Sequence, residues 1–259
     1  MNNLEEKLNT IDNLKRKLDE LRPLSADTTK NLKIHFDTKI INNSIRGKGN
    51  TFTYQEIKDL LEGSIICEKK DCEHLEIVDY KNALDYIVEL SEKKITKLNA
   101  TNILNIHTIL FRNIDPENGG KYRNGQAWVS SGNEDKDMVC DPLLIPNEMN
   151  NFFNWLFSEK KEHSLIIASD AHNKFVSIHP FVDGNGRTGR LIMNLILQKD
   201  GYVPVIIKSY KRKEKYDDAI KSWKNGEKEN FYIYIADCEI ESLEECLEII
   251  QRIHTSDWH

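Results

Sequence analysis

The chain has 259 residues, of which 39% are hydrophobic and 30% charged, and its formal net charge is −6. This length and composition indicate a globular protein with one core, or one core plus a helical extension. The acidic balance gives no indication of bulk nucleic-acid binding, no apolar run approaches membrane-spanning length, and residues 1–4 do not begin a signal peptide. We therefore expect a cytoplasmic protein with no nucleic-acid or membrane partner.

The five cysteines are scattered along the chain, and their odd number and irregular spacing indicate free thiols rather than a disulfide framework. Cys67, Cys72 and His74 lie close enough in sequence to suggest metal ligands. No second ligand pair at zinc-site spacing completes them, so we do not predict a metal site there.

The N-terminal segment is predicted to form helices. Apolar residues recur every three or four positions from Leu4 to Leu21, which indicates an amphipathic helix that Pro23 stops. This helix either docks on the domain or forms a short coiled-coil arm, which leaves a homodimer open. A second helix is expected from residues 25–28 to 45, and a third over 53–62.

The rest of the chain is also predicted to be mainly helical. Segment 67–73 is charged and is predicted as a loop. Helical periodicity then recurs over 76–90, 101–111, 147–157, 164–179, 187–198, 216–223 and 231–253. Segment 122–138 mixes Trp128 and Val129 with turn residues and gives the strongest β signal, a short hairpin. The predicted fold class is therefore mainly α with one short β-hairpin.

The segment that organises the chain is HPFVDGNGRTGR, residues 179–190. Pro180 disfavours helical geometry at His179, so the helix that arrives there should stop. Gly184 and Gly186 allow a tight turn whose amides can form an anion-binding nest. The turn leads into the next helix, whose N-terminus favours a phosphate. Arg187 and Arg190 lie three positions apart and can grip one polyphosphate from the same side.

This segment resembles the HxFx(D/E)GNGRxxR signature of the Fic domain family and fits it at every fixed position. Residues 120–123 and 128–132 resemble the substrate-positioning flap of Fic domains, and residues 171–204 resemble the core helices. The resemblance implies a Fic-fold helical bundle. It divides the chain into an N-terminal helical region, 1–98, with an inhibitory-helix-like segment, and a Fic core with C-terminal helices, 99–259.

The resemblance also implies an activity, the transfer of AMP from ATP to a Ser, Thr or Tyr hydroxyl of a protein. In that reaction His179 would be the catalytic residue that accepts the hydroxyl proton, and Asp183 would bind Mg²⁺. The amides of Gly184, Asn185 and Gly186 would cradle the α- and β-phosphate oxygens. Arg187 and Arg190 would hold the β- and γ-phosphates. The flap, residues 122–132, would pair with an extended segment of the target protein.

The segment Ser44–Gly49 resembles the family's inhibitory pattern (S/T)xxxE(G/N), except that Lys48 replaces the glutamate. In the family that glutamate pairs with the second arginine of the motif, here Arg190. A lysine would repel an arginine, so the sequence predicts that this inhibitory contact is lost and that the protein AMPylates itself. The alternative is that Lys48 is an exposed loop lysine without a role.

Other activities stay open at this point. They are a Fic enzyme with another nucleotide or phosphate-containing donor, and a non-enzymatic module that keeps the loop as an anion site. Two further histidines are interpreted as structural. His107 is expected to pack or to cap a helix, and His172 shares a face with His179 without completing a metal site.

Overall fold

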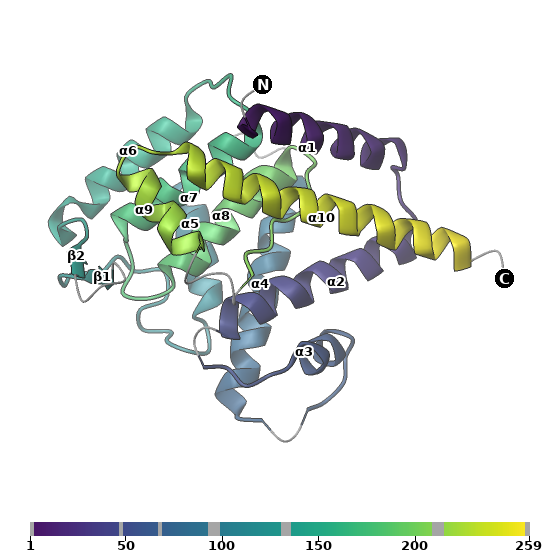
Figure 1. The fold of residues 1–259 in the computed structure, drawn as a ribbon. Helices are drawn as coiled ribbons and strands as arrows, with labels where there is room; N and C mark the ends of the chain where they lie inside the picture. Colours follow the sequence, from purple (N-terminus) through teal and green to yellow (C-terminus); the bar gives the residue numbers. More distant parts are fainter. Residues whose placement is uncertain are drawn as a thin grey trace. The chain divides into compact units, whose positions relative to one another are not determined.

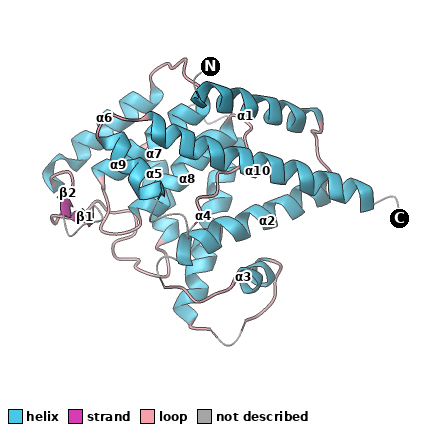
Figure 2. Cartoon of the chain, viewed as in Figure 1, coloured by secondary structure: helices cyan, strands magenta, loops and turns pink. Residues whose placement is uncertain are grey.

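The computed structural model describes residues 3–46, 49–66, 69–92, 99–130, 136–208 and 215–256. The chain forms two compact units, one of residues 1–73 and 200–259 and the other of residues 74–199. Helices make up most of both, as Figure 2 shows, so the predicted mainly helical class is confirmed. The sequence predicted a different division, at residue 98, between an N-terminal helical region and the core. That division rests on resemblance to a family rather than on compactness, so it stays a prediction. No helix within the described ranges is both long and apolar enough to cross a bilayer.

The first unit is built around its C-terminal helix, α10 (Glu229–Ser256). Helix α1 (Asn3–Glu20) packs along α10, and α2 (Ala26–Ile45) contacts both α10 and α3 (Tyr54–Leu61), as Figure 1 shows. The short α9 (Asp217–Lys224) also packs against α10. The three predicted N-terminal helices are therefore confirmed. Ser25 begins α2 by accepting a hydrogen bond from the Thr28 amide at 3.1 Å.

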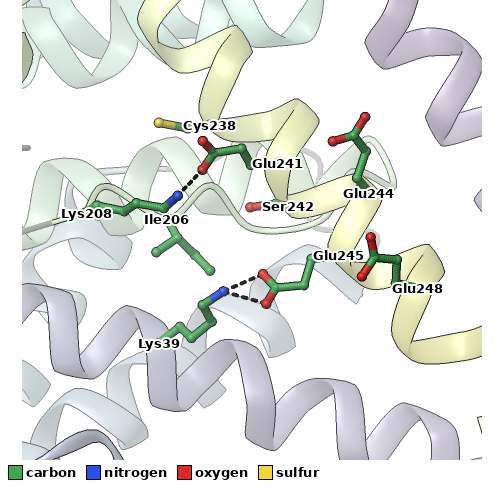
Figure 3. Close-up of a pocket in the computed structure, with 9 residues that line it drawn as sticks. All are labelled: Lys39, Ile206, Lys208, Cys238, Glu241, Ser242, Glu244, Glu245 and Glu248. Carbon is green, nitrogen blue, oxygen red and sulfur yellow. Dashed lines mark hydrogen bonds and ion pairs between the residues drawn. The ribbon is translucent and has the colours of Figure 1, made fainter. Parts of the chain in front are cut away.

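The first unit has a surface crevice of about 310 Å³ between α2, α10 and the segment that ends at residue 208. Figure 3 shows two ion pairs across it, Lys39 with Glu245 at 2.6 Å and Lys208 with Glu241. Among the described residues that line the crevice, both lysines are thus already paired with carboxylates of α10. The remaining lining charges are acidic, so this crevice is not suited to bind phosphate.

In the described part of the second unit, the α-helices are α4 (Asp71–Glu92), which begins at the end of the first unit, α5 (Ala100–Leu110), α6 (Ile145–Phe157), α7 (Ser164–Ile178) and α8 (Asn185–Lys199). Helix α7 packs against α6 and α8, and α5 also contacts α8. The core around α7 and α8 contains Phe175, Phe181, Leu191 and Ile192, none of them exposed. Burial of these side chains holds the α7–α8 connection in place.

The N-terminus of α4 corrects one prediction. Residues 71–73 were expected in a loop, but they form the first turn of α4. Acidic side chains in a first turn stabilise a helix through its dipole, and Asp71 and Glu73 both lie there. Glu73 also accepts hydrogen bonds from the amide and hydroxyl of Thr51, at 3.2 and 2.6 Å. The charge that suggested a loop is therefore part of a helix start.

Two three-residue strands lie between α5 and α6. β1 (Trp128–Ser130) and β2 (Lys136–Met138) pair antiparallel, with Trp128 opposite Met138. Residues 131–135, which join them, lie outside the described ranges. Residues 122–127, which the sequence analysis included in the hairpin, are not part of a strand. A 3-10 turn, η2 (Pro142–Leu144), leads from the strand pair into α6.

Candidate active site

The candidate site is the connection between α7 and α8, residues 179–190. His179 ends α7 in the left-handed conformation, with φ 53° and ψ 58°, and its amide donates to the Phe175 carbonyl at 3.1 Å. It is the only non-glycine residue with positive φ in the described part of the chain. Pro180 prevents the helix from continuing, as the sequence predicted. His179 itself is half-buried.

The side chain of Asn185 closes the turn. Its Oδ1 accepts from the Phe181 amide at 2.9 Å, and its Nδ2 donates to the Phe181 carbonyl at 2.8 Å. The Thr188 amide donates to the Gly184 carbonyl at 2.9 Å, which is the first helical bond of α8. The amides of Asn185, Gly186 and Arg187 precede that bond, so α8 offers them to a ligand. The side chain of Asn185 therefore holds the loop, and its amide is not used in the first helical bond of α8.

Gly184 is required by both conformation and space. Its φ is +79°, and a Cβ at this position would lie 2.3 Å from Cε2 of Phe111. The turn at Gly184 therefore packs directly against Phe111, the residue that follows α5. Gly186 has no such strain, but a Cβ there would lie 3.4 Å from Nη1 of Arg190. The absence of a side chain at Gly186 keeps the start of α8 open beside that guanidinium.

Arg187 is buried and is already engaged by two carboxylates. Its Nη1 donates to Glu76 of α4 at 2.9 Å, and its Nη2 donates to Asp183 at 3.3 Å. The guanidinium also lies 4.7 Å from the centre of the Phe111 ring. Sequence analysis missed Glu76, because one carboxylate on an amphipathic helix carries no signal of its partner.

Arg190 is equally buried, at 6% exposure, but its surroundings differ. Its Nη2 is buried and has no hydrogen-bond partner among the described residues. An arginine cannot lose its charge near neutral pH, and a buried charge without a partner is costly. This guanidinium lies beside Gly186 at the start of α8, where the amides and the helix dipole also favour an anion. The arrangement therefore fits an anionic ligand.

Asp183 lies on the solvent side of the turn, with its side chain 49% exposed. Its Oδ1 accepts from the Gly184 amide at 2.7 Å, and its Oδ2 contacts Arg187. The described residues contain no group of three or more His, Cys, Asp or Glu side chains arranged to hold a metal. A cation at this site would therefore need oxygen ligands from the substrate in addition to Asp183.

His107 of α5 packs against the turn between α7 and α8 and is hydrogen-bonded to it. Its Nδ1 accepts from the Gly120 amide at 2.9 Å, which leaves Nε2 to donate to the Asp183 carbonyl, also at 2.9 Å. Its ring stacks between Phe111 and Phe181, with ring centres 4.5 and 3.7 Å away. Burial lowers the pKa of His107 to about 4, so the ring is neutral. The prediction of a packed histidine is confirmed; His172, also fully buried, lies within α7.

The chain is similar to known proteins. Residues 97–197 match the Fic/DOC family, so the chain carries a Fic domain. The protein adenylyltransferase Fic of Drosophila melanogaster is 37% identical over 207 residues, which are 79% of this chain and 41% of that protein. The chain therefore spans about two fifths of the length of the curated relatives it matches.

Two solved structures show that the fold extends beyond the matched domain. A Fic domain containing signalling protein from Bacteroides thetaiotaomicron has a TM-score of 0.86 and 23% identity, and the match covers 93% of this chain and 97% of that one. Fic-1 from C. elegans, residues 134–508, has a TM-score of 0.81 and 24% identity, with 95% and 71% covered. Identities this low show the shared Fic fold alone.

Proposed function

We propose that this chain is a protein adenylyltransferase that transfers AMP from ATP to a Ser, Thr or Tyr hydroxyl of a protein. Relatives that are 37% identical to this chain over 207 residues bear that name. The structural observation that carries the proposal is Nη2 of Arg190, which is buried beside a glycine turn without a hydrogen-bond partner among the described residues. A triphosphate supplies the negative charge that this place lacks.

The roles of the two arginines follow from their surroundings. Arg190 holds the β- and γ-phosphates and stabilises the charge of the leaving pyrophosphate. The amides of Asn185 and Gly186 contact the α- and β-phosphate oxygens. The Gly184 amide, for which the sequence predicted the same role, instead donates to Asp183 Oδ1. Arg187 forms ion pairs with Glu76 and Asp183. It therefore adds positive charge near the phosphates and also holds the Asp183 carboxylate in one orientation.

Asp183 is the residue that would hold Mg²⁺. A half-exposed carboxylate fits an ion that usually binds one protein carboxylate and completes its shell with substrate phosphates and water. When bound, Mg²⁺ would neutralise charge on the phosphate oxygens. The bond from Arg187 to Oδ2 orients the carboxylate, and the bond from the Gly184 amide to Oδ1 ties it to the turn.

His179 is the catalytic residue of the proposal. A neutral imidazole can accept a proton from a hydroxyl group as a general base. In the transfer, His179 takes the hydroxyl proton and the hydroxyl oxygen attacks the α-phosphorus. The bond from that phosphorus to the bridging oxygen breaks, and the electron pair leaves with pyrophosphate. The left-handed backbone at His179 sets the direction from which the imidazole can reach this oxygen.

The strand pair β1 and β2 supports a docking role for the predicted flap. An extended segment of the target would add to a strand edge through main-chain hydrogen bonds. Trp128 of β1 is 57% exposed, which gives this edge an apolar contact for the target. Alanine at Trp128 should raise KM for the protein target and leave the affinity for ATP unchanged.

We also propose that the chain lacks the inhibitory glutamate of the family and AMPylates itself. Helix α2 ends at Ile45 with Arg46 as its C-cap, and residues 47 and 48 lie outside the described ranges. The support is therefore the sequence, in which Lys48 stands at the glutamate position. Lys48→Glu should lower self-labelling at least about tenfold if a new ion pair blocks the phosphates. Equal labelling in both proteins would overturn this part of the proposal.

The decisive experiment is incubation with ATP and Mg²⁺, with the label at either the α- or the γ-phosphate. Label from the α-phosphate should appear on the protein and disappear in His179→Ala. His35→Ala is the matched control, because His35 lies outside the motif, on α2, and pairs with Glu245. Transfer from the γ-phosphate alone would indicate a kinase-like reaction. No transfer from any donor would indicate an anion-binding module.

Cellular context stays a matter of prediction. The cytoplasmic location, the absence of nucleic-acid and membrane partners and the homodimer left open by the Leu-rich first helix are expectations from the sequence. Fractionation of cells that produce the protein and size-exclusion chromatography of the purified chain would test them.

A further inference from the structure

A second buried arginine, Arg123, connects the strand pair to the candidate active site. It is 4% exposed and lies five residues before β1. Its guanidinium donates to backbone carbonyls from all three nitrogens, with Nε bonded to His179 at 2.8 Å, Nη1 to Gly125 at 2.8 Å and Nη2 to Cys140. Its own amide donates to the Pro180 carbonyl at 2.9 Å. One residue thus makes four hydrogen bonds to the main chain.

These bonds join two places that are far apart in the sequence. Gly125 precedes β1 and Cys140 follows β2, so the guanidinium holds both ends of the strand pair. The bonds to the carbonyls of His179 and Pro180 hold the end of α7. If the strand pair moves, the guanidinium of Arg123 moves with it, and its hydrogen bond to the His179 carbonyl changes.

His179 needs such support, because the left-handed conformation is unfavourable for a residue that has a Cβ. The direction of its imidazole depends on this backbone conformation. The bond from Arg123 fixes the carbonyl of His179, and the bond to Pro180 fixes the next peptide unit. Both peptide units that define the backbone after His179 are therefore held by Arg123.

We propose that Arg123 is a positioning residue that holds His179 in its left-handed conformation and couples it to the strand pair. The proposal rests on the proposed adenylyl transfer for its consequence in catalysis, but the positioning itself is independent of that activity. Target binding at the strand pair would then stabilise the arrangement of the catalytic histidine. A lysine cannot replace Arg123, because one ammonium does not span carbonyls in three directions.

The test compares Arg123→Lys with Arg112→Lys, an exposed arginine just after α5. Arg123→Lys should lower kcat at least about tenfold, with KM for ATP changed less than about twofold, because His179 is misplaced while the phosphate site is intact. A loss of activity that comes only from a higher KM for ATP, with kcat unchanged, would contradict a positioning role. Arg112→Lys should behave as the wild type.

A readout without catalysis separates this proposal from the proposed function. The ring C–H resonances of His179, assigned with His179→Ala, should shift in Arg123→Lys and stay in place in Arg112→Lys. An unchanged His179 signal in folded Arg123→Lys would overturn the proposal. If the wild type transfers no AMP but this shift appears, the proposed function fails and the positioning role stands.

The wild type alone gives a further measurement in case Arg123→Lys does not fold. The Nε–H of Arg123 donates to a carbonyl and is buried, so it should exchange slowly with solvent deuterium. Exchange as fast as that of Arg112 would overturn the proposal whatever the variants show.

Discussion

Arg190 and Glu239 are buried ionisable side chains that each carry at least one buried polar atom without a hydrogen-bond partner among the described residues. Arg190 lies at the start of α8 with its Nη2 unpaired. Glu239 lies in the middle of α10 and is fully buried, and neither of its carboxyl oxygens has a hydrogen-bond partner among the described residues. Burial raises the pKa of Glu239 well above its ordinary value.

The difference lies in what each group can do about its charge. A glutamate becomes neutral by taking a proton, so Glu239 can be buried without any ligand. An arginine keeps its charge at any ordinary pH. An unpaired buried arginine therefore indicates a missing anion, and an unpaired buried glutamate does not. Arg187, three positions before Arg190, has its charge balanced by two carboxylates around its guanidinium, although its Nε is also buried without a partner among the described residues.

The largest effect on stability is expected from Arg187→Ala. This change leaves Glu76 and Asp183 without their cation and should lower the free energy of unfolding by about 3–5 kcal/mol, the range for a broken buried pair. Arg252→Ala is the control, because Arg252 and Glu248 form an exposed pair worth at most about 1 kcal/mol. Urea denaturation of both variants measures the difference. Similar losses in the two would show that Arg187 is not a structural cation.

His107 gives the intermediate case, a buried group that is neutral and has partners. Its folded-state pKa of about 4 lies below the unfolded value. The unfolded chain therefore binds more protons between about pH 6.5 and pH 4, and up to about 3 kcal/mol of stability is lost as the pH falls through that window. His107→Phe should be less stable at pH 7 but should lose this acid dependence. Thermal unfolding at several pH values measures it, and an unchanged acid slope would contradict the assignment.

Arg190→Ala should act on binding rather than stability. Loss of charge-assisted hydrogen bonds to phosphate should weaken ATP binding by about 1.5–3 kcal/mol, roughly ten- to a hundredfold. The free energy of unfolding without nucleotide should stay the same or rise, because an unpaired charge is removed from a buried place. Calorimetric titration with ATP and Mg²⁺ measures this, with Arg112→Ala as the control. If Arg190→Ala were less stable than the wild type and bound ATP with normal affinity, Arg190 would be a structural cation rather than a phosphate ligand.

The smallest effect is expected from Glu239→Gln. Because the folded-state pKa of Glu239 is raised above the unfolded value of about 4.3, its contribution is fully present below that pH and is lost as the pH rises above it. A glutamine stays neutral, so the variant should be more stable at pH 8 by on the order of 1 kcal/mol. Glu244→Gln, exposed on the same helix, should change little. Parallel pH dependence in wild type and Glu239→Gln would contradict a protonated Glu239.

The local features of the site could be predicted from the sequence because they depend on neighbours in the chain. Pro180 ends α7 at His179, the glycine turn follows, and α8 begins at Asn185. The helices of both units were also predictable from apolar periodicity. The roles of Arg123 and Glu76 were not, because each acts on a group at least 50 positions away.

The division of labour between the two motif arginines was also beyond the sequence. Their spacing predicted that both would grip a polyphosphate, but only the fold brings Glu76 to Arg187 and leaves Nη2 of Arg190 without a described partner. Tertiary contacts thus separate two residues that look equivalent in the motif. Lys48, the other residue singled out by the sequence, lies outside the described ranges.

The most direct test of the account is an experimental structure with a non-hydrolysable ATP analogue and Mg²⁺. The account predicts the triphosphate at the start of α8, with the guanidinium of Arg190 on its terminal phosphates and the imidazole of His179 facing the α-phosphorus. A nucleotide bound elsewhere, with Arg190 paired to a protein carboxylate, would contradict it.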